Sequence, residues 1–325
     1  MLNIITQTLA LLHSNDEWKA RYDGYLNDIW NNPPKRSKGF RTPAGLSVYT
    51  TIGSRNTPIY FLRFKGQNVG EVRVTKNGIE LTSRAKSEDF KKCPLSTTNN
   101  VKWHSKEASE FRKFFLDLSR KENDIHTHSE EHHVENALLK EFRKSKSIEK
   151  ALSNIQPVLL HGNFFQMPTP LKASTHQPSY SESKGGGIDI LARIKAKNGH
   201  TRLCIIEIKD ENENKETQKQ AMSQAVTYAT FIAALLQDQP EWMEFFNAHT
   251  SQRGLSRNTD KHDLEVVTIM PTGTTETFED EKIKIPGESP FTLHCHSLYY
   301  DKQIFNTTSK FVFSGTFLQE IKSIN

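Results

Sequence analysis

Residues 187–209 read GIDILARIKAKNGHTRLCIIEIK, and the charged residues inside this stretch constrain how the chain folds. Asp189 interrupts the apolar run 187–191, and Glu207 and Lys209 interrupt the apolar run 204–209. Neither run alternates regularly between apolar and polar residues, which is typical of strands covered on both faces. Charged side chains in such strands are costly to bury unless they are paired or bound to a metal. The stretch therefore predicts two buried strands that carry a polar site.

The turn between the two strands decides whether these charged side chains meet. A two-residue turn would point Asp189 away from Glu207, whereas the three-residue loop 197–199 places the two directly opposite each other. That loop is a type I turn closed by a left-handed residue, and Gly199 falls at the left-handed position. Lys209, two residues after Glu207, projects from the same face of the strand. The glycine therefore favours the register in which two carboxylates and an ammonium group converge.

Such a group of side chains is suited to metal-dependent chemistry. Two carboxylates a few ångströms apart repel each other and suit a hard divalent cation such as Mg²⁺, which prefers oxygen ligands. A lysine beside that ion can orient or deprotonate a water molecule, or stabilise charge in the transition state. Metal-dependent phosphodiester hydrolysis is the reaction that uses these groups together.

The sequence on either side of the hairpin predicts further helices and strands. Apolar spacings of three or four predict helices, and short β-rich runs predict strands. In chain order the expected elements are helix 130–144, strands 164–171, 188–196 and 202–209, helix 217–236 and strand 264–270. Segments 282–285 and 291–298 are expected to extend the sheet. Pro168 and Pro170 would shift strand 164–171 towards a sheet edge or shorten it.

In these features the sequence resembles the PD-(D/E)XK nuclease superfamily, which has the restriction-endonuclease-like fold. The resemblance rests on Asp189, on Glu207-Ile208-Lys209 eighteen positions later, and on the element order αβββαβ over residues 130–270. No proline precedes Asp189, and Gly187-Ile188 stands there instead, a substitution that the family often shows. The resemblance implies an α/β catalytic domain with a mixed central sheet and a metal-dependent deoxyribonuclease activity.

Two helices carry further positions of the family pattern. Gln224 and Tyr228 are similar to the Gln-apolar-x-x-Tyr motif of helicase-associated exonucleases, and a spacing of four places them on one helix face. Glu135 stands where many members have a glutamate on the first helix. A charged helix face capped by Ser129 would explain Glu135 equally well.

The resemblance also implies a role for each site residue. The metal, Mg²⁺ with Mn²⁺ as a substitute, would be held by Asp189, Glu207, Ile208 and Glu135. Lys209 would activate or position the attacking water. Gln224 and Tyr228 would support the metal site or touch the DNA backbone.

The first 125 residues predict a different kind of module. Residues 1–30 have helical spacing, and Pro33-Pro34 ends that helix. A basic loop follows and contains Lys35, Arg36, Lys38 and Arg41, a candidate DNA-backbone contact or a solvated connection. Four short runs separated by turn residues, 47–52, 59–64, 69–74 and 79–82, predict an antiparallel meander, and 107–118 predicts a helix.

Length and charge distribution suggest two domains of unequal charge. The 325 residues divide at the polar segment 122–129 into a smaller α+β domain, 1–125, and a catalytic domain, 126–325. The first holds 21 Lys and Arg against 13 Asp and Glu, whereas the second holds 22 against 25. A basic half beside an acidic half fits a DNA-facing module next to a site that gathers carboxylates, although ordinary surface charge gives the same count.

Composition excludes several classes of protein. The three cysteines are too few and too far apart for a disulfide framework or a zinc ribbon. No run approaches the roughly 20 apolar residues of a membrane helix, and the first 18 residues lack the charged start and cleavage site of a signal peptide. We therefore expect a protein of a reducing compartment, the cytoplasm, with no membrane partner.

Two histidine groups compete with this interpretation. His128 and His132, in a group with His126 and His133, are four apart and could chelate zinc, but a solvated helix start explains them more simply. His294-Cys295-His296 alternates along a strand, so that both histidines share a face, and core packing or solvent exposure explains it without a metal.

The expected function is that of a Mg²⁺-dependent DNA nuclease, acting on double-stranded DNA as a monomer or a homodimer. The alternative is a non-catalytic nucleic-acid-binding or regulatory protein that retains the fold. Metal-dependent hydrolysis of another phosphoester remains open, because the three charged residues alone do not select the substrate.

Overall fold

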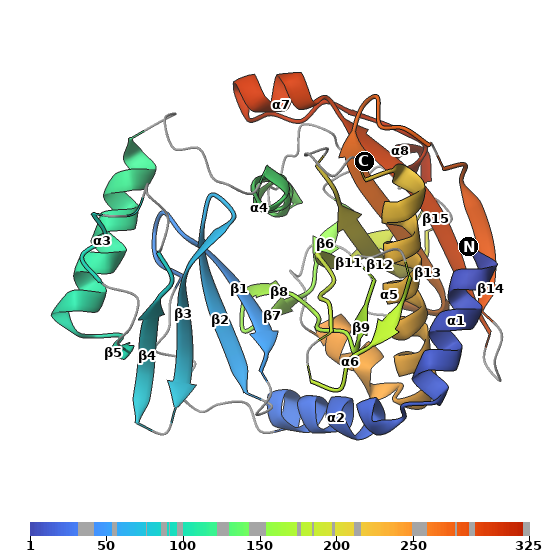
Figure 1. The fold of residues 1–325 in the computed structure, drawn as a ribbon, viewed down its shortest axis with the longest axis horizontal. Helices are drawn as coiled ribbons and strands as arrows, with labels where there is room; N and C mark the ends of the chain where they lie inside the picture. Colours follow the sequence, from blue (N-terminus) through green and yellow to red (C-terminus); the bar gives the residue numbers. More distant parts are fainter. Residues whose placement is uncertain are drawn as a thin grey trace.

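The computed structural model describes residues 1–31, 42–53, 57–75, 77–85, 90, 92–95, 100–121, 130–142, 154–173, 177–183, 185–196, 199–210, 216–248, 259–276, 278–285 and 290–320. Within these residues the chain is a mixed α/β structure built on two large sheets. The helix α4 (Glu130–Phe142) lies between the two sheets (Figure 1).

The first sheet begins as the predicted antiparallel meander. Its strands are β1 (Ser47–Ile52), β2 (Pro58–Phe64), β3 (Gln67–Thr75), β4 (Gly78–Ser83) and β5 (Asn100–Lys102). Each strand pairs with the next in antiparallel fashion, which confirms the meander. The helix α3 (Lys106–Arg120) confirms the predicted helix 107–118 and buries Phe111 and Phe115 in the core of this sheet.

This sheet continues into the second half of the chain. Strand β1 pairs in parallel with β8 (Asn163–Phe165), and β8 pairs with β7 (Leu159–Leu160). Strands far apart in the sequence therefore share one sheet, and the polar segment 122–129 does not separate two independent sheets.

The predicted strand 164–171 is wrong in its extent. Strand β8 ends at Phe165, and β9 (Leu171–Lys172) forms a separate ribbon with β10 (Ser179–Tyr180). Pro168 and Pro170 interrupt the run because proline has no amide hydrogen to donate to a ladder. Pro168 makes an isolated bridge to Gly187, so the segment still passes beside the start of the central hairpin.

The second sheet has the strand order β14-β15-β13-β12-β11-β6, with β16 beside β15. Its strands are β6 (Gln156–Pro157), β11 (Ile190–Lys195), β12 (Thr201–Ile208), β13 (Thr259–Pro271), β14 (Glu281–Ile285), β15 (Phe291–Tyr300) and β16 (Phe313–Ser314). Pairing is parallel between β12, β13 and β15 and antiparallel elsewhere, so the sheet is mixed. Strands β14 and β15 extend it as predicted, whereas β6 takes the edge beside β11.

The hairpin of β11 and β12 has the predicted register. Ile190 pairs with Ile206 and Lys195 with Thr201, so Asp189 and Glu207 are the next opposed positions. The amide of Gly199 donates to the carbonyl of Ala196, and Gly199 has the left-handed φ of +88°. Gly199, in this left-handed conformation, therefore closes the turn in the register that brings the charged residues together.

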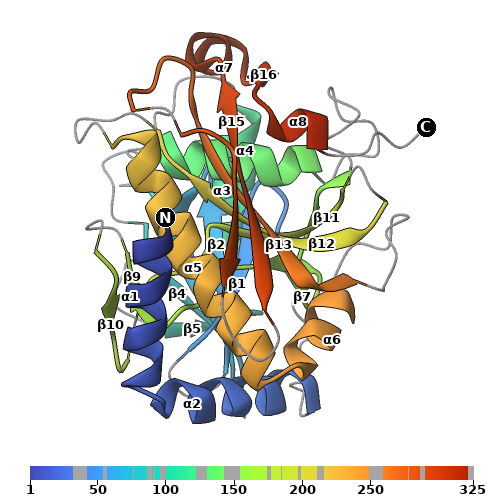
Figure 2. The same cartoon turned by 90° about the vertical axis from the view of Figure 1, so that its right-hand side faces the viewer.

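Helices cover both faces of the second sheet. The helix α5 (Gln218–Asp238) crosses one face, with α6 (Glu241–Ala248) at its end (Figure 2). On the other face, α4 packs with the segment that contains α7 (Lys302–Thr308) and α8 (Phe317–Glu320). In the part of the chain that is described, no helix is long and apolar enough to cross a membrane.

The first helical segment differs from the expected single helix. It forms α1 (Leu2–His13), α2 (Glu17–Leu26) and a π-helical turn (Asn27–Asn31). Ser14 and Asn15 separate the first two, since their side chains donate back to the carbonyls of the preceding turn.

These N-terminal helices belong to the core of the second sheet rather than to the meander. Trp18 and Tyr22 pack edge-on against Phe231 of α5, with ring centroids 5.7 and 4.9 Å apart. Figure 2 shows α1 alongside α5. The helices α1 and α2 thus pack against the second sheet, whereas α3 packs against the first.

Candidate active site

The site lies where β11 begins and β12 ends, at one end of these two neighbouring strands of the second sheet. Asp189 directly precedes β11, and the amide of Ile208 donates a hydrogen bond of 2.9 Å to its Oδ2. This bond ties the carboxylate of Asp189 to the Glu207–Lys209 segment and brings the main chain of Ile208 into the site. Burial raises the pKa of Asp189 above its ordinary value, and Glu135 adds to the rise while Lys209 opposes it.

Glu207 is buried, with 1% of its surface exposed, as little as Glu135. Its Oε1 lies 3.0 Å from Nζ of Lys209 and accepts a hydrogen bond of 2.5 Å from Nε2 of Gln224. Its Oε2 is buried and has no hydrogen-bond partner among the described residues. Burial and the nearby Asp189 raise the pKa of Glu207 well above its ordinary value. A buried carboxylate oxygen without a donor is the environment that a bound cation would satisfy.

Lys209 is surrounded by acids. Besides Glu207, its Nζ lies 3.8 Å from Glu131 and 4.0 Å from Glu216. Burial alone would lower the pKa of Lys209, but Glu207, Asp189 and the other two acids raise it above its ordinary value. Lys209 is therefore a protonated ammonium ion in this arrangement, and it offsets part of the negative charge that the acids bring together.

Gln224 and Tyr228 lie one turn apart on α5 and face the site, as the spacing of four predicts. Gln224 orients Glu207 and is also hydrogen-bonded to the Tyr228 side chain. Burial, with Glu207 and Asp189 nearby, raises the pKa of Tyr228, so its hydroxyl stays protonated. A Cβ on Gly186 would lie 2.2 Å from that hydroxyl, so the absence of a side chain at Gly186 makes room for Tyr228.

Glu135 reaches the site but is already bound to a residue of the first sheet. Its Oε2 lies 2.8 Å from Nη1 of Arg63 and 3.3 Å from Nδ1 of His132. The guanidinium of Arg63 also lies over the ring of Tyr49, 3.9 Å from its centroid. Oε1 of Glu135 is buried and has no hydrogen-bond partner among the described residues. Glu135 thus presents one free oxygen, while the other joins α4 to β2.

Sequence reasoning missed two residues that the fold brings to this site. Glu131 precedes Glu135 by one helical turn, and burial together with Asp189 raises its pKa to about 7. The spacing of four along α4 could have indicated it. Arg63 stands as a charged residue in the apolar strand β2, but only the tertiary structure identifies its partner.

The remaining predicted residues have different outcomes. Lys35, Arg36, Lys38 and Arg41 lie outside the described residues, as do His126 and His128. His132 pairs with Glu135, and His133 packs its ring 5.4 Å from Phe305. Across the described ranges, no three His, Cys, Asp or Glu side chains are arranged as a metal-binding group. Asp189 and Glu207 form a pair of carboxylates, and Arg63 binds one oxygen of the third acid, Glu135.

We compared the chain with protein-family models, with curated proteins and with solved structures, and none of them matches it.

Proposed function

We propose that the chain is a metal-dependent nuclease that hydrolyses phosphodiester bonds of DNA. The observation that carries the proposal is the convergence of Asp189, Glu207 and Lys209, with Oε2 of Glu207 buried without a donor. Buried acids at this density are costly unless a cation neutralises them. The helix α4, the hairpin of β11 and β12, the helix α5 and the strand β13 follow one another as in a restriction-endonuclease-like core, which supports the same proposal.

Oxygen donors suit Mg²⁺ or Mn²⁺, and the residues present fit such an ion. Asp189 and Glu207 would hold it through their carboxylates, Ile208 through its main-chain carbonyl, and Glu135 through its free oxygen. When bound, the metal would lower the pKa of a water molecule and polarise the scissile phosphate.

The side chains around these acids have distinct tasks in the proposed reaction. Lys209, held as an ammonium ion, can donate to a phosphate oxygen and offset the negative charge that grows in the transition state. Gln224 fixes Glu207 through its amide, and the protonated Tyr228 hydroxyl supports that amide. Glu131 lies 3.8 Å from the Lys209 ammonium and helps to hold it in the site.

The proposal predicts cleavage that needs both the metal and the acids. Plasmid and linear duplex DNA incubated with the protein and Mg²⁺ should be cut, and EDTA should stop the cutting. Asp189→Asn, Glu207→Gln and Lys209→Ala should each lower the rate about 100-fold or more, because each removes charge from the reacting centre. Gel analysis of digestion against time measures these rates.

Glu244→Gln is the matched control, since Glu244 is exposed on α6 and the same chemical change there should leave the rate unaltered. Cutting that survives EDTA, or that is unchanged in Asp189→Asn and Lys209→Ala, would contradict the proposal. DNA binding without cleavage under Mg²⁺ or Mn²⁺ would favour the non-catalytic alternative.

A further inference from the structure

A cavity lies on the other side of α4 from the candidate active site. Its volume is about 380 Å³, and its walls come from the turn between β2 and β3, from α4, and from the segment after α7. That volume falls within the range of small-molecule sites. The turn is fixed on α4 by a close approach, because a Cβ on Gly66 would lie 2.1 Å from the carbonyl oxygen of His132. The cavity is thus a built feature of the contact between the two sheets.

Three lysines and one histidine line the walls. Lys65 comes from the turn, His133 and Lys140 from α4, and Lys310 from the segment after α7. Glu141 is the one acidic side chain that the described residues contribute to the lining. Among the same residues, no ion pair involves Lys65, Lys140 or Lys310. Three separate segments therefore direct three lysines into one cavity that a single described acid, Glu141, also lines.

Partial burial and the neighbouring positive charges both act on the pKa values of these groups. Burial lowers the pKa of Lys140, and Lys65 lowers it further. Burial also lowers the pKa of His133, with Lys65 and Lys140 acting in the same direction. An anion in the cavity would relieve this repulsion, because it would interact favourably with all of these groups at once.

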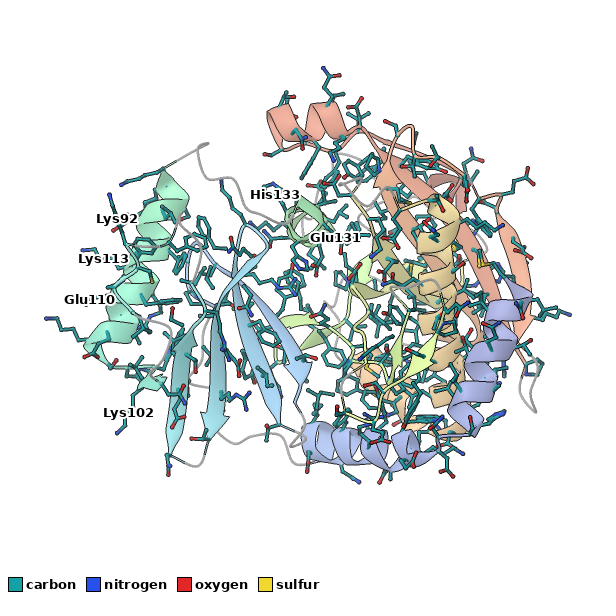
Figure 3. The ribbon with its side chains drawn as sticks, viewed as in Figure 1. Lys92, Lys102, Glu110, Lys113, Glu131 and His133 are labelled. Carbon is teal, nitrogen blue, oxygen red and sulfur yellow. The ribbon has the colours of Figure 1, made fainter. Side chains whose placement is uncertain are left out.

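The cavity is distinct from the proposed nuclease site. On α4, Glu131 and Glu135 share one face, whereas His133 and Lys140 lie on the opposite face, as the 100° step per residue requires. Figure 3 shows Glu131 and His133 on different sides of the helix. A ligand in the cavity would therefore touch α4, the turn between β2 and β3 and the segment after α7 without entering the space between Asp189 and Glu207.

We propose that this cavity binds the phosphate group of a nucleotide, either free or at the end of a nucleic-acid strand. Lysines from several directions are suited to the oxygens of a terminal phosphate, which can accept from all of them. Phe311 also lines these walls, but its ring is stacked between Phe305 and Phe313, with centroids 4.6 and 5.0 Å away, so recognition rests on the phosphate group. The proposal does not rest on the nuclease activity, since binding here needs neither the metal nor Asp189.

Calorimetric titration of the whole protein in EDTA tests the proposal without cleavage. The probes are inorganic phosphate, adenosine 5′-monophosphate, and a 12-base-pair duplex with and without a 5′-phosphate. Lys140→Gln and Lys310→Gln should each weaken phosphate-dependent binding about tenfold, because each removes one charged donor. Both side chains reach solvent at the cavity rather than the apolar core, so the variants should fold, and thermal unfolding checks this.

Lys113→Gln on α3 is the matched control, because this exposed lysine lies far from the cavity (Figure 3) and should not alter binding. Lysine-dependent binding of the monophosphate identifies a free nucleotide as the ligand. A preference for the phosphorylated duplex alone identifies a strand end, and both results support the proposal. Dissociation constants that are the same in wild type, Lys140→Gln and Lys310→Gln for every probe would overturn it, and this result is independent of any loss of cleavage.

Discussion

Arg63 joins strand β2 to helix α4 through a buried ion pair with Glu135. Both side chains are almost entirely excluded from solvent, and the pair is completed by the ring of Tyr49. Removal of one partner of a buried pair leaves an uncompensated charge, whereas replacement of both partners by apolar groups can be nearly neutral. The loss in free energy of unfolding therefore depends on whether one or both charges of the pair are removed.

Arg63→Met should lower the free energy of unfolding by about 3 kcal/mol, because Glu135 would remain buried without its cation. The double variant Arg63→Met/Glu135→Leu should recover most of that loss. Urea unfolding followed by circular dichroism measures both values. Arg120→Met is the control: its pair with Asp117 is exposed and 3.7 Å long, and the loss should stay below about 1 kcal/mol. Equal losses in Arg63→Met and the double variant would contradict this account.

At the scale of elements, the strands β12, β13 and β15 carry a buried polar cluster on the face that α4 and α8 cover. Arg202 binds Glu265 and Asp263 at 2.6 and 3.0 Å. His296 lies 3.1 Å from Glu265 and 3.0 Å from Asp280. Cys295 points to the opposite face and joins the apolar core beneath α5. The alternation predicted for His294-Cys295-His296 is thus confirmed; both histidines are buried beside acids, which corrects the expectation of solvent exposure.

The cluster predicts a dependence of stability on pH. Burial alone would lower the pKa of His296, but hydrogen bonds to Glu265 and Asp280 raise it above its ordinary value of 6.5. A raised pKa in the folded state stabilises the fold fully below pH 6.5, and this contribution is lost as the pH rises through the folded value. The free energy of unfolding should therefore fall above pH 6.5 in the wild type, and His296→Gln should flatten that fall.

Urea unfolding at several pH values between 6 and 9 measures the slope. His104→Gln, a change at an exposed histidine, should keep the slope of the wild type. If His296→Gln keeps the wild-type slope as well, the acids around His296 do not hold a proton on its imidazole in the folded state.

At the scale of the whole molecule, the two sheets do not form separable units. Strand β1 pairs with β8, and Tyr49 of β1 packs in one apolar cluster with Leu138 of α4 and Ile190 of β11. The helices α1 and α2 complete the core over α5. Figure 1 shows these N-terminal helices beside the second sheet, although they precede the first in the sequence.

The fragment 126–325 should consequently fail to fold by itself. It would lose β1, α1 and α2, and the apolar surfaces beneath them would face water. Amide proton NMR dispersion and cooperative thermal unfolding, compared with the full chain, measure this outcome. A fragment with well-dispersed amide proton signals and cooperative thermal unfolding would indicate that residues 126–325 form an independent domain.

Local pattern and turn chemistry were sufficient for much of the fold. The meander, α3, α5 and the register of the central hairpin follow from alternation, helical spacing and the glycine at position 199, which act over a few residues. The same register predicted that Asp189, Glu207 and Lys209 would meet. Pro168 and Pro170 indicated that strand 164–171 would be shortened, but that its first part joins the meander sheet through β1 is a long-range contact that local pattern does not record.

The sequence by itself determined the central hairpin and the charged residues that it brings together, because strand alternation and one left-handed glycine are local properties. Only the tertiary structure decided that Arg63 occupies one oxygen of Glu135, that Glu131 stands beside Lys209, and that lysines from three segments line one cavity. These contacts join residues about 70 to 245 positions apart in the chain. They arise from the packing of one sheet against the other through α4, and no periodicity along the chain records such packing.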